Sequence, residues 1–317
     1  MKKTDDAAGH GHLSRRGFLS ASIAASMAGV VTVAGCGTKA VSPPAGSLRQ
    51  RASSIEFDRI ERTTGGRIGV VALDLATGER LAHRPAERFA MCSTFKWVLG
   101  ALVLQRVEAG RDKLERHIDF GPEQLVSYSP VTKKYAGQGM TVGQLCDAML
   151  TISDNTAANL LLETVKGPAG FTAGVRALGD TMTRLDRLEP ELNENKKNDP
   201  QDTSTPDAMA RLMQTVLFGD VLKPESVLQL RQWMLDNRTG RNRLRAGFGN
   251  VWQVGNRTGT SVNNQSNDVA FAVSRSQAMR VPGPLIVVSY ANVPEPMGAA
   301  ADAVHAMVAR EVTRAFS

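Results

Sequence analysis

The chain contains two kinds of hydrophobic pattern, apolar runs typical of strands and the wider apolar spacing typical of helices. The segment from Arg67 to Asp74 is apolar between charged ends and predicts a strand. Thr77-Gly78 is a turn signal, and the segment from Glu79 to His83 predicts a second strand, so that the two form a hairpin. Near the C-terminus, short apolar runs predict three more strands, at Val251–Asn256, Asp268–Ser274 and Leu285–Tyr290.

Helical spacing of apolar residues is found in most other segments. Between Leu48 and Arg62, Ile55 and Ile60 lie among charged residues, which predicts a helix that ends before Gly65-Gly66. Further helices are expected from about Ser93 to Gln105, in stretches between residues 105 and 245, and from Ala299 to Phe316. Strands near both ends and helices in the middle favour an α/β fold, in which a sheet lobe carries a helical insertion. We expect the active site in the cleft between these lobes.

The size and composition of the chain are typical of a globular protein. It has 317 residues, of which 42% are hydrophobic and 22% are charged, enough for one large domain or two lobes. No segment beyond the N-terminal region is long and apolar enough to span a membrane. The net charge is +7, but the basic residues are scattered and no aromatic residues lie between them. This pattern argues against a nucleic-acid partner.

The first 35 residues are expected to be an export signal rather than part of the fold. Ser14–Ser20 (SRRGFLS) resembles the twin-arginine signal, and a weakly apolar segment from Phe18 to Gly35 follows it. Export by this route implies that the protein folds before it crosses the membrane. We therefore expect residues 1–35 to be removed and the protein to be periplasmic or exposed at the cell surface.

The end of this segment resembles a lipoprotein processing site. Val33-Ala34-Gly35-Cys36 places a cysteine directly after small residues at the end of the apolar run. Several acyl chains on Cys36 would anchor the protein stably, whereas one chain alone binds a membrane only marginally. Residues 36–47, with Pro43-Pro44, would then be the lipidated cysteine and a flexible tether, and residues 48–317 the folded domain. The alternative is an ordinary signal peptide in which the cysteine occurs by chance.

The remaining cysteines and the histidines indicate no metal site. If Cys36 carries lipid, only Cys92 and Cys146 could pair, and their spacing does not decide whether they do. No Cys/His cluster has the spacing of metal ligands, so neither a zinc enzyme nor another cofactor is expected.

Ser93-Thr94-Phe95-Lys96 is the first candidate for catalytic chemistry. On a helix, residues three apart share a face, so Lys96 is expected beside the Ser93 hydroxyl. A serine hydroxyl is a poor nucleophile unless a neighbouring group takes its proton. The backbone N–H groups at the helix N-terminus would also favour developing negative charge. By itself the Ser-x-x-Lys pattern is common, and a serine that merely starts a helix is the alternative interpretation.

Three further elements follow in order along the chain. The second motif, Ser153-Asp154-Asn155, lies sixty residues later, and the third motif, Arg257-Thr258-Gly259, ends a predicted strand. The long polar segment from Leu188 to Pro206 contains Glu189-Pro190-Glu191-Leu192-Asn193, and a loop of this length inside a compact domain is usually functional. A carboxylate with a nearby amide can hold and deprotonate a water molecule. An acidic surface loop without function is the alternative.

Together these motifs resemble those of class A serine β-lactamases, with Arg257 where a lysine is usual. Glu189 to Asn193 resembles the Glu-x-x-Leu-Asn signature of their omega loop, and the resemblance covers roughly residues 50–316. It implies an α+β sandwich, in which an antiparallel sheet lobe flanked by helices meets an all-helical lobe. It also implies that a β-lactam is hydrolysed through a covalent intermediate, and that the protein is a monomer without a cofactor.

The resemblance implies a role for each motif residue. Ser93 attacks the lactam carbonyl, and the N–H groups of Ser93 and Thr260 form the oxyanion hole. Lys96 takes the serine proton, or Glu189 takes it through water; Ser153 protonates the lactam nitrogen. Glu189 and Asn193 hold the deacylating water. The substrate-binding residues would be Tyr128, Asn155, Arg243, Arg257, Thr258, Gly259 and Thr260, while Asp154 would hold neighbouring backbone.

Three positions depart from the usual pattern. Arg257 offers a planar fork for a carboxylate but cannot give up a proton, so proton exchange with Ser153 is in doubt. The usual arginine after the third motif is missing, and we expect Arg243 to bind the substrate carboxylate instead; a surface arginine is the alternative. In some carbapenem-hydrolysing members a cysteine at the position of Cys92 pairs with one just after the third motif, where this chain has Thr260-Ser261. The usual partner position of Cys146 is Gly100, so two free thiols are expected. Carbapenem hydrolysis cannot be inferred.

Two other functions share part of this pattern. A DD-peptidase or penicillin-binding protein would have the first three motifs but needs no deacylating glutamate. A β-lactam sensor would be acylated and stay so, and it usually lies beside a transmembrane signalling segment. Glu189 with Asn193 favours the hydrolase.

Overall fold

The computed structural model describes residues 45–196, 198–275, 283–294 and 298–317. The predicted signal peptide, Cys36 and residues 37–44 of the predicted tether lie outside the described residues. In the described part, no helix is long and apolar enough to cross a membrane.

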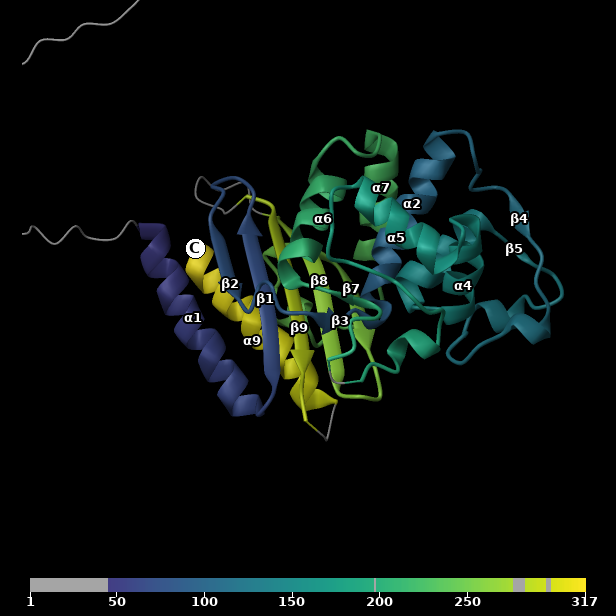
Figure 1. Cartoon of the computed structure of the whole chain (residues 1–317). Helices are drawn as coiled ribbons and strands as arrows, with labels where there is room; N and C mark the ends of the chain where they lie inside the picture. The colour runs from purple at the N-terminus through teal and green to yellow at the C-terminus, as the bar shows by residue number, and fades with distance from the viewer. Residues whose placement is uncertain (1–44, 197, 276–282, 295–297) are drawn as a thin grey trace, which may run out of the picture. The chain divides into compact units, whose positions relative to one another are not determined.

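A five-stranded antiparallel sheet forms one half of the fold, with the strand order β2-β1-β9-β8-β7 (Figure 1). The strands are β1 (Arg67–Asp74), β2 (Arg80–His83), β7 (Trp252–Thr260), β8 (Gln265–Ser274) and β9 (Leu285–Asn292). All five predicted strands are therefore confirmed, as is the β1–β2 hairpin. β7 extends past its predicted end through the third motif, because Arg257 to Thr260 pair with β8.

Both faces of this sheet are covered by helices. α1 (Ala45–Thr64), α8 (Leu244–Phe248) and α9 (Ala299–Phe316) cover one face, where Val70 packs into a core with residues of these helices. α6 (Pro206–Phe218) lies on the other face, and Val71 belongs to that core. A strand buried on both faces needs apolar side chains at successive positions, which is why β1 is continuously apolar rather than alternating.

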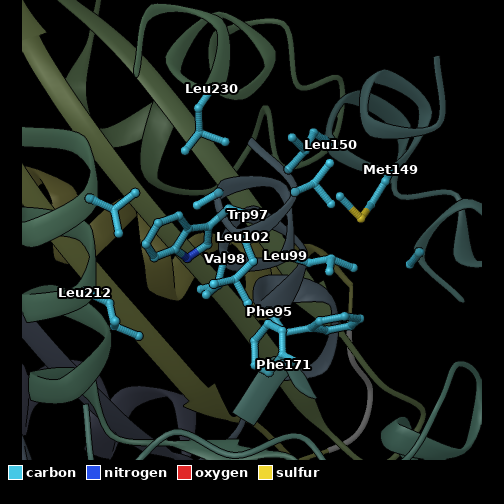
Figure 2. Packing of buried hydrophobic residues seen from close by; sticks show 14 of the residues in the cluster. Phe95, Trp97, Val98, Leu99, Leu102, Met149, Leu150, Phe171, Leu212 and Leu230 are labelled. Carbon is cyan, nitrogen blue, oxygen red and sulfur yellow. The ribbon is translucent and has the colours of Figure 1, made fainter. Parts of the chain in front are cut away.

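The helical lobe is built around α2 (Phe95–Glu108), which is buried from Phe95 to Leu104. Figure 2 shows the side chains of Trp97, Leu99 and neighbouring apolar residues packed together around this helix. The lobe also contains α3 (Val142–Asp147), the π-helical turn η4 (Ala148–Ile152), α4 (Asn155–Thr164), α5 (Gly167–Ala177) and α7 (Pro224–Leu235). A sheet lobe and a helical lobe are thus both present, as predicted. Two short pairs, β3 (Phe89–Ala90) with β6 (Thr203–Ser204) and β4 (His117–Ile118) with β5 (Met140–Thr141), complete the strands of the described residues.

The first helix differs from its prediction in two ways. It begins at Ala45, inside the segment predicted as a tether. Its buried stripe consists of Ser53, Phe57 and Ile60, while Ile55 is 67% exposed. Of the two isoleucines whose spacing predicts this helix, only Ile60 faces the core, because residues two apart on a helix point in nearly opposite directions and Phe57 takes the inward position.

Candidate active site

A cavity of about 350 Å³ contains most of the predicted site residues. Its wall is formed by β7 on one side and by the helical lobe and the connections around it on the other. The lining residues are Ser93, Tyr128, Ser153, Asn155, Asn193, Thr239, Gly240, Arg243, Thr258, Gly259, Thr260 and Asp302. Three predicted residues, Lys96, Glu189 and Arg257, do not line the cavity but are buried in contact with residues that do.

Ser93 lies in a tight turn directly before α2. The predicted helix start at Ser93 is a 3-10 turn, η1 (Cys92–Thr94), and α2 itself begins at Phe95. β7 packs closely against this turn: a Cβ atom on Gly259 would lie 2.6 Å from the carbonyl oxygen of Met91 and 3.1 Å from the Ser93 nitrogen. Only glycine fits at this position, and its absent side chain brings the end of β7 next to the backbone of Ser93.

Three residues at the site have a strained backbone conformation. Cys92, Tyr128 and Ser153 have φ values of +46°, +60° and +71°, although none of them is glycine. Such conformations cost about 1–3 kcal/mol each and are concentrated at functional sites. Tyr128 is 59% exposed and forms part of the cavity wall, as predicted.

Glu189 connects the nucleophile to the buried lysine. The Ser93 hydroxyl donates to Oε1 of Glu189 at 3.2 Å, and Nζ of Lys96 lies 2.9 Å from the same oxygen. Ser93 and Lys96 therefore share one carboxylate oxygen, rather than simply standing side by side on one helix face. Both charged side chains are fully buried, and a buried charge needs such a partner.

Lys96 also holds the second motif. Its ammonium group donates to the carbonyl of Ser153 at 3.0 Å, to Oδ1 of Asn155 at 2.6 Å, and to Oγ of Ser153 at 3.3 Å. Burial lowers the pKa of Lys96 to about 8, although the charge of Glu189 opposes this shift. Part of the Lys96 population is therefore neutral near physiological pH, a state in which the amine accepts a proton.

Arg257 lies behind Ser153 and is completely buried. Its Nη2 donates a short hydrogen bond to Oγ of Ser153, and its Nε donates to the carbonyl of Ser93 at 3.2 Å. Burial lowers the pKa of Arg257 to about 10. Oγ of Ser153 thus accepts from two cationic donors, Arg257 and Lys96, and its own hydrogen is left to be donated into the cavity.

The other two residues of the second motif anchor its surroundings. Asn155 donates to the carbonyl of Ser127 at 2.9 Å. Asp154 accepts from the backbone N–H groups of Val131 and Thr132 at 2.9 Å and from that of Ala157 at 3.0 Å. The prediction that Asp154 holds neighbouring backbone is confirmed.

The long loop is closed at its neck by an ion pair. Nε of Arg187, near the start of the loop, lies 2.6 Å from Oδ2 of Asp202, near its end. Inside the loop, Nδ2 of Asn193 donates to Oε2 of Glu189 at 2.6 Å. One oxygen of Glu189 thus contacts the nucleophile and the other contacts the amide that the sequence paired with it.

Asn159 also holds this loop, and the sequence analysis missed it. Its Nδ2 donates to the carbonyl of Glu189 at 2.8 Å, and its Oδ1 accepts from the N–H of Glu189 at 3.0 Å. The available signal was its position four residues after Asn155, which places both side chains on one face of α4.

Arg243 lies at the cavity, as predicted, but with several protein partners. Its guanidinium donates to the carbonyls of Gly259 at 3.1 Å and Asn267 at 2.8 Å, and to Oγ1 of Thr260 at 2.8 Å. Nε of Arg243 also forms an ion pair of 2.6 Å with Asp302. Asp302, in the first turn of α9, is a cavity residue that the sequence analysis did not identify.

Cys92 precedes Ser93 in the turn, while Cys146 lies in α3 and His305 in α9. Cys92 and Cys146 are buried free thiols, and burial raises the pKa of both, that of Cys92 to about 12. His305 is buried between the hydroxyls of Ser266 and Ser289. In the part of the chain that the structure describes, no group of three or more His, Cys, Asp or Glu side chains is arranged to hold a metal ion.

Residues 52–315 match the model of the β-lactamase enzyme family. β-Lactamase L2 of Stenotrophomonas maltophilia is 45% identical over 261 residues, which cover 81% of this chain and 86% of that protein. The solved structure of a class A β-lactamase representing the last common ancestor of Gram-negative bacteria has a TM-score of 0.80 and 50% identity, over 84% of this chain and 100% of that one. A β-lactamase from Xanthomonas campestris pv. campestris has a TM-score of 0.81 and 41% identity, over 85% and 99% of the two chains. The chain therefore belongs to the β-lactamase enzyme family and has the fold of its class A members.

Proposed function

We propose that the protein hydrolyses the amide bond of penicillins and cephalosporins through an ester on Ser93, and thereby gives resistance to these antibiotics. One observation carries the proposal: the carboxylate of Glu189 contacts the Ser93 hydroxyl with one oxygen and the Asn193 amide with the other. This arrangement suits a base that activates water beside an acyl group on Ser93.

Acylation begins when Oγ of Ser93 attacks the lactam carbonyl. The hydroxyl proton passes through water to Glu189 or to neutral Lys96, whose amine contacts the Glu189 oxygen that accepts from Ser93. The N–H groups of Ser93 and Thr260 stabilise the oxyanion, and removal of one such donor costs about 2.7–4 kcal/mol in serine hydrolases. The C–N bond then breaks, and the hydroxyl of Ser153 protonates the departing nitrogen, because its oxygen already accepts from two donors. The proton taken from Ser93 then passes through Lys96 to Oγ of Ser153, which restores the Ser153 hydroxyl.

Deacylation requires a water molecule that is held beside the acyl group by Glu189 and Asn193. Glu189 takes a proton from this water, whose oxygen attacks the ester carbonyl, and Ser93 recovers its proton as the product leaves. The buried Oδ1 atom of Asn193 has no hydrogen-bond partner among the described residues, which leaves it free to accept from such a water.

The remaining lining residues would bind the substrate. Arg243 and Thr258 form the polar end of the cavity that suits the substrate carboxylate, with the charge of the buried Arg257 behind Ser153, and Asn155 suits the side-chain amide. Gly259 and Thr260 present the edge of β7, and Tyr128 covers the side chain of the substrate.

The location of the protein is also a proposal. The twin-arginine pattern and Val33–Cys36 support export, removal of residues 1–35 and lipidation of Cys36, so that the enzyme acts as a membrane-anchored monomer outside the cytoplasm. Metabolic labelling with a fatty-acid analogue tests this in wild type and Cys36→Ala. Equal label in both would exclude lipidation at Cys36.

Turnover and intact mass together test the proposed hydrolysis. Wild type should turn over many equivalents of a chromogenic cephalosporin and of benzylpenicillin. Glu189→Ala should stall with one ring-opened adduct on Ser93, whereas Glu191→Ala, an exposed glutamate of the same loop, should behave like wild type. A stable adduct on the wild type would instead indicate a sensor or a penicillin-binding protein.

A further inference from the structure

A second cavity, of about 560 Å³, opens on the helical lobe. It lies at the C-terminal end of α2, next to α5 and the connection that precedes α7. Its apolar part consists of Leu102, Val165, Gly170, Gly174, Ala177 and Val221. The volume lies within the range of about 300–1,000 Å³ that small-molecule sites occupy.

Small residues on one face of α5 keep this cavity open. Gly170, Gly174 and Ala177 follow one another at helical spacing, four and then three residues apart. A Cβ atom on Gly174 would lie 2.8 Å from Cδ2 of Leu102, so α5 approaches α2 closely there and leaves the hollow beside the contact.

Four cations surround the apolar part: Arg106, Arg111, Lys166 and Lys223. Glu108 is the one acidic residue in the wall, and it accepts from the backbone N–H of Lys223 at 2.8 Å. Among the described residues, none of the four cations forms an ion pair, and the buried Nε of Arg106 has no hydrogen-bond partner.

Nη2 of Arg106 donates to the carbonyl of Arg111 at 3.4 Å, so this cation is held by backbone rather than by a carboxylate. Several other surface arginines are paired with carboxylates, for example Arg67 with Glu87, Arg80 with Asp207 and Arg184 with Asp186. Unpaired cations of one sign around a concave apolar surface attract an anion, because the low-dielectric wall strengthens their combined field.

The cavity is separate from the active site. It shares no lining residue with the cavity around Ser93. Ser93 precedes α2 and Arg106 lies near its end, and thirteen residues of helix correspond to about 20 Å at 1.5 Å per residue.

We propose that this cavity binds a small anionic amphiphile, with an aliphatic or aromatic body against Leu102 and Gly174 and a carboxylate or phosphate among the four cations. The apolar residues bury the aliphatic or aromatic part of the ligand, and the cations donate charge-assisted hydrogen bonds to its carboxylate or phosphate.

Calorimetric titration separates the contribution of apolar burial from that of charge. The probes have ten-carbon chains and are used below the concentrations at which they form micelles. Decanoate and decyl phosphate should bind at least tenfold more tightly than decanol, and decyltrimethylammonium should not bind measurably. The amide signals of Gly170 and Gly174 in two-dimensional NMR should move with decanoate, which locates the site and distinguishes it from the cavity around Ser93.

Two variants test the location and the charge. Ala177→Trp, at an exposed position of α5, should fill the hollow and abolish decanoate binding while the thermal midpoint stays within a few degrees. Arg111→Gln/Lys223→Gln should weaken decanoate binding at least tenfold and leave decanol unchanged. Arg62→Gln/Arg310→Gln removes the same charge from exposed positions on α1 and α9 and should change nothing. The proposal is overturned if decanoate binds no better than decanol, or if Ala177→Trp binds it like wild type.

Discussion

Arg257 donates a short hydrogen bond to the hydroxyl of Ser153 while lying completely outside solvent. The same guanidinium contacts the carbonyl of Ser93, so one side chain connects the proton donor to the turn that carries the nucleophile. A lysine cannot reproduce this, because it has one nitrogen on a flexible chain whereas arginine has a planar fork.

Arg257→Lys should therefore lose one of the two contacts. A hydrogen bond to a charged group contributes about 1.5–3 kcal/mol, so kcat/KM should fall roughly tenfold or more. The loss should differ between benzylpenicillin and a cephalosporin, because their carboxylates are attached to rings of different size. Steady-state kinetics with both substrates checks this, with Arg62→Lys as the control. An unchanged ratio of the two kcat/KM values contradicts the prediction.

Asn159 should act as a positioning residue for Glu189. Asn159→Leu keeps a similar volume but removes both hydrogen bonds to the Glu189 backbone, which should slow deacylation at least tenfold and affect acylation less. Stopped-flow measurement of the two steps should show that the acyl-enzyme accumulates. Denaturant unfolding should show a loss of about 1–3 kcal/mol in the free energy of unfolding. Glu163→Gln, on the exposed side of the same helix, is the control. If both steps slow equally, Asn159 has only a structural role.

The pKa of Lys96 leads to a test of which group takes the serine proton. In Glu189→Gln, Lys96 is the remaining base near the Ser93 hydroxyl. The acyl-enzyme on Ser93 should be stable enough in this variant for its formation to be followed. Burial lowers the pKa of Lys96 to about 8 and Glu189 raises it, so the pKa in this variant should lie below 8. The acylation rate should fall tenfold per pH unit below that pKa, since only the neutral amine accepts a proton. A rate independent of pH between 5 and 8 would exclude Lys96 as the base.

Much of this structure was predictable, because strong local patterns specify it. β1 and α9 have the bounds that were predicted, since a strand buried on both faces and a closing amphipathic helix are distinct patterns. The two-residue strands β3, β4, β5 and β6 were missed, because pairs so short are set by tertiary contacts rather than by their own residues.

The site residues likewise divide into those that a local motif specifies and those that only a tertiary contact specifies. Ser93, Lys96, Ser153 and Glu189 could be named from the sequence because their motifs have fixed spacing, and the structure brings them together. Asn159 and Asp302 were not, since each matters only through a residue far away in the chain, Asn159 through Glu189 and Asp302 through Arg243. Ile55 and Ile60 predicted the first helix but not its buried face, because two apolar residues do not say which of them faces a core that Phe57 also fills.

His305 should make the stability of the fold sensitive to acid. It is buried between Ser266 and Ser289, and burial, assisted by the charge of Arg243, lowers its pKa well below 6.5. The unfolded chain thus binds this proton more readily than the folded one, so the stabilisation is complete above about pH 6.5 and decreases as the pH falls below it. One such group contributes a slope of up to about 1.36 kcal/mol per pH unit. Urea unfolding of wild type and His305→Gln between pH 7.5 and 4.5 measures this: the two curves should run parallel above pH 6.5, and the wild type should lose stability faster below it. Parallel curves over the whole range would mean that other groups set the acid sensitivity.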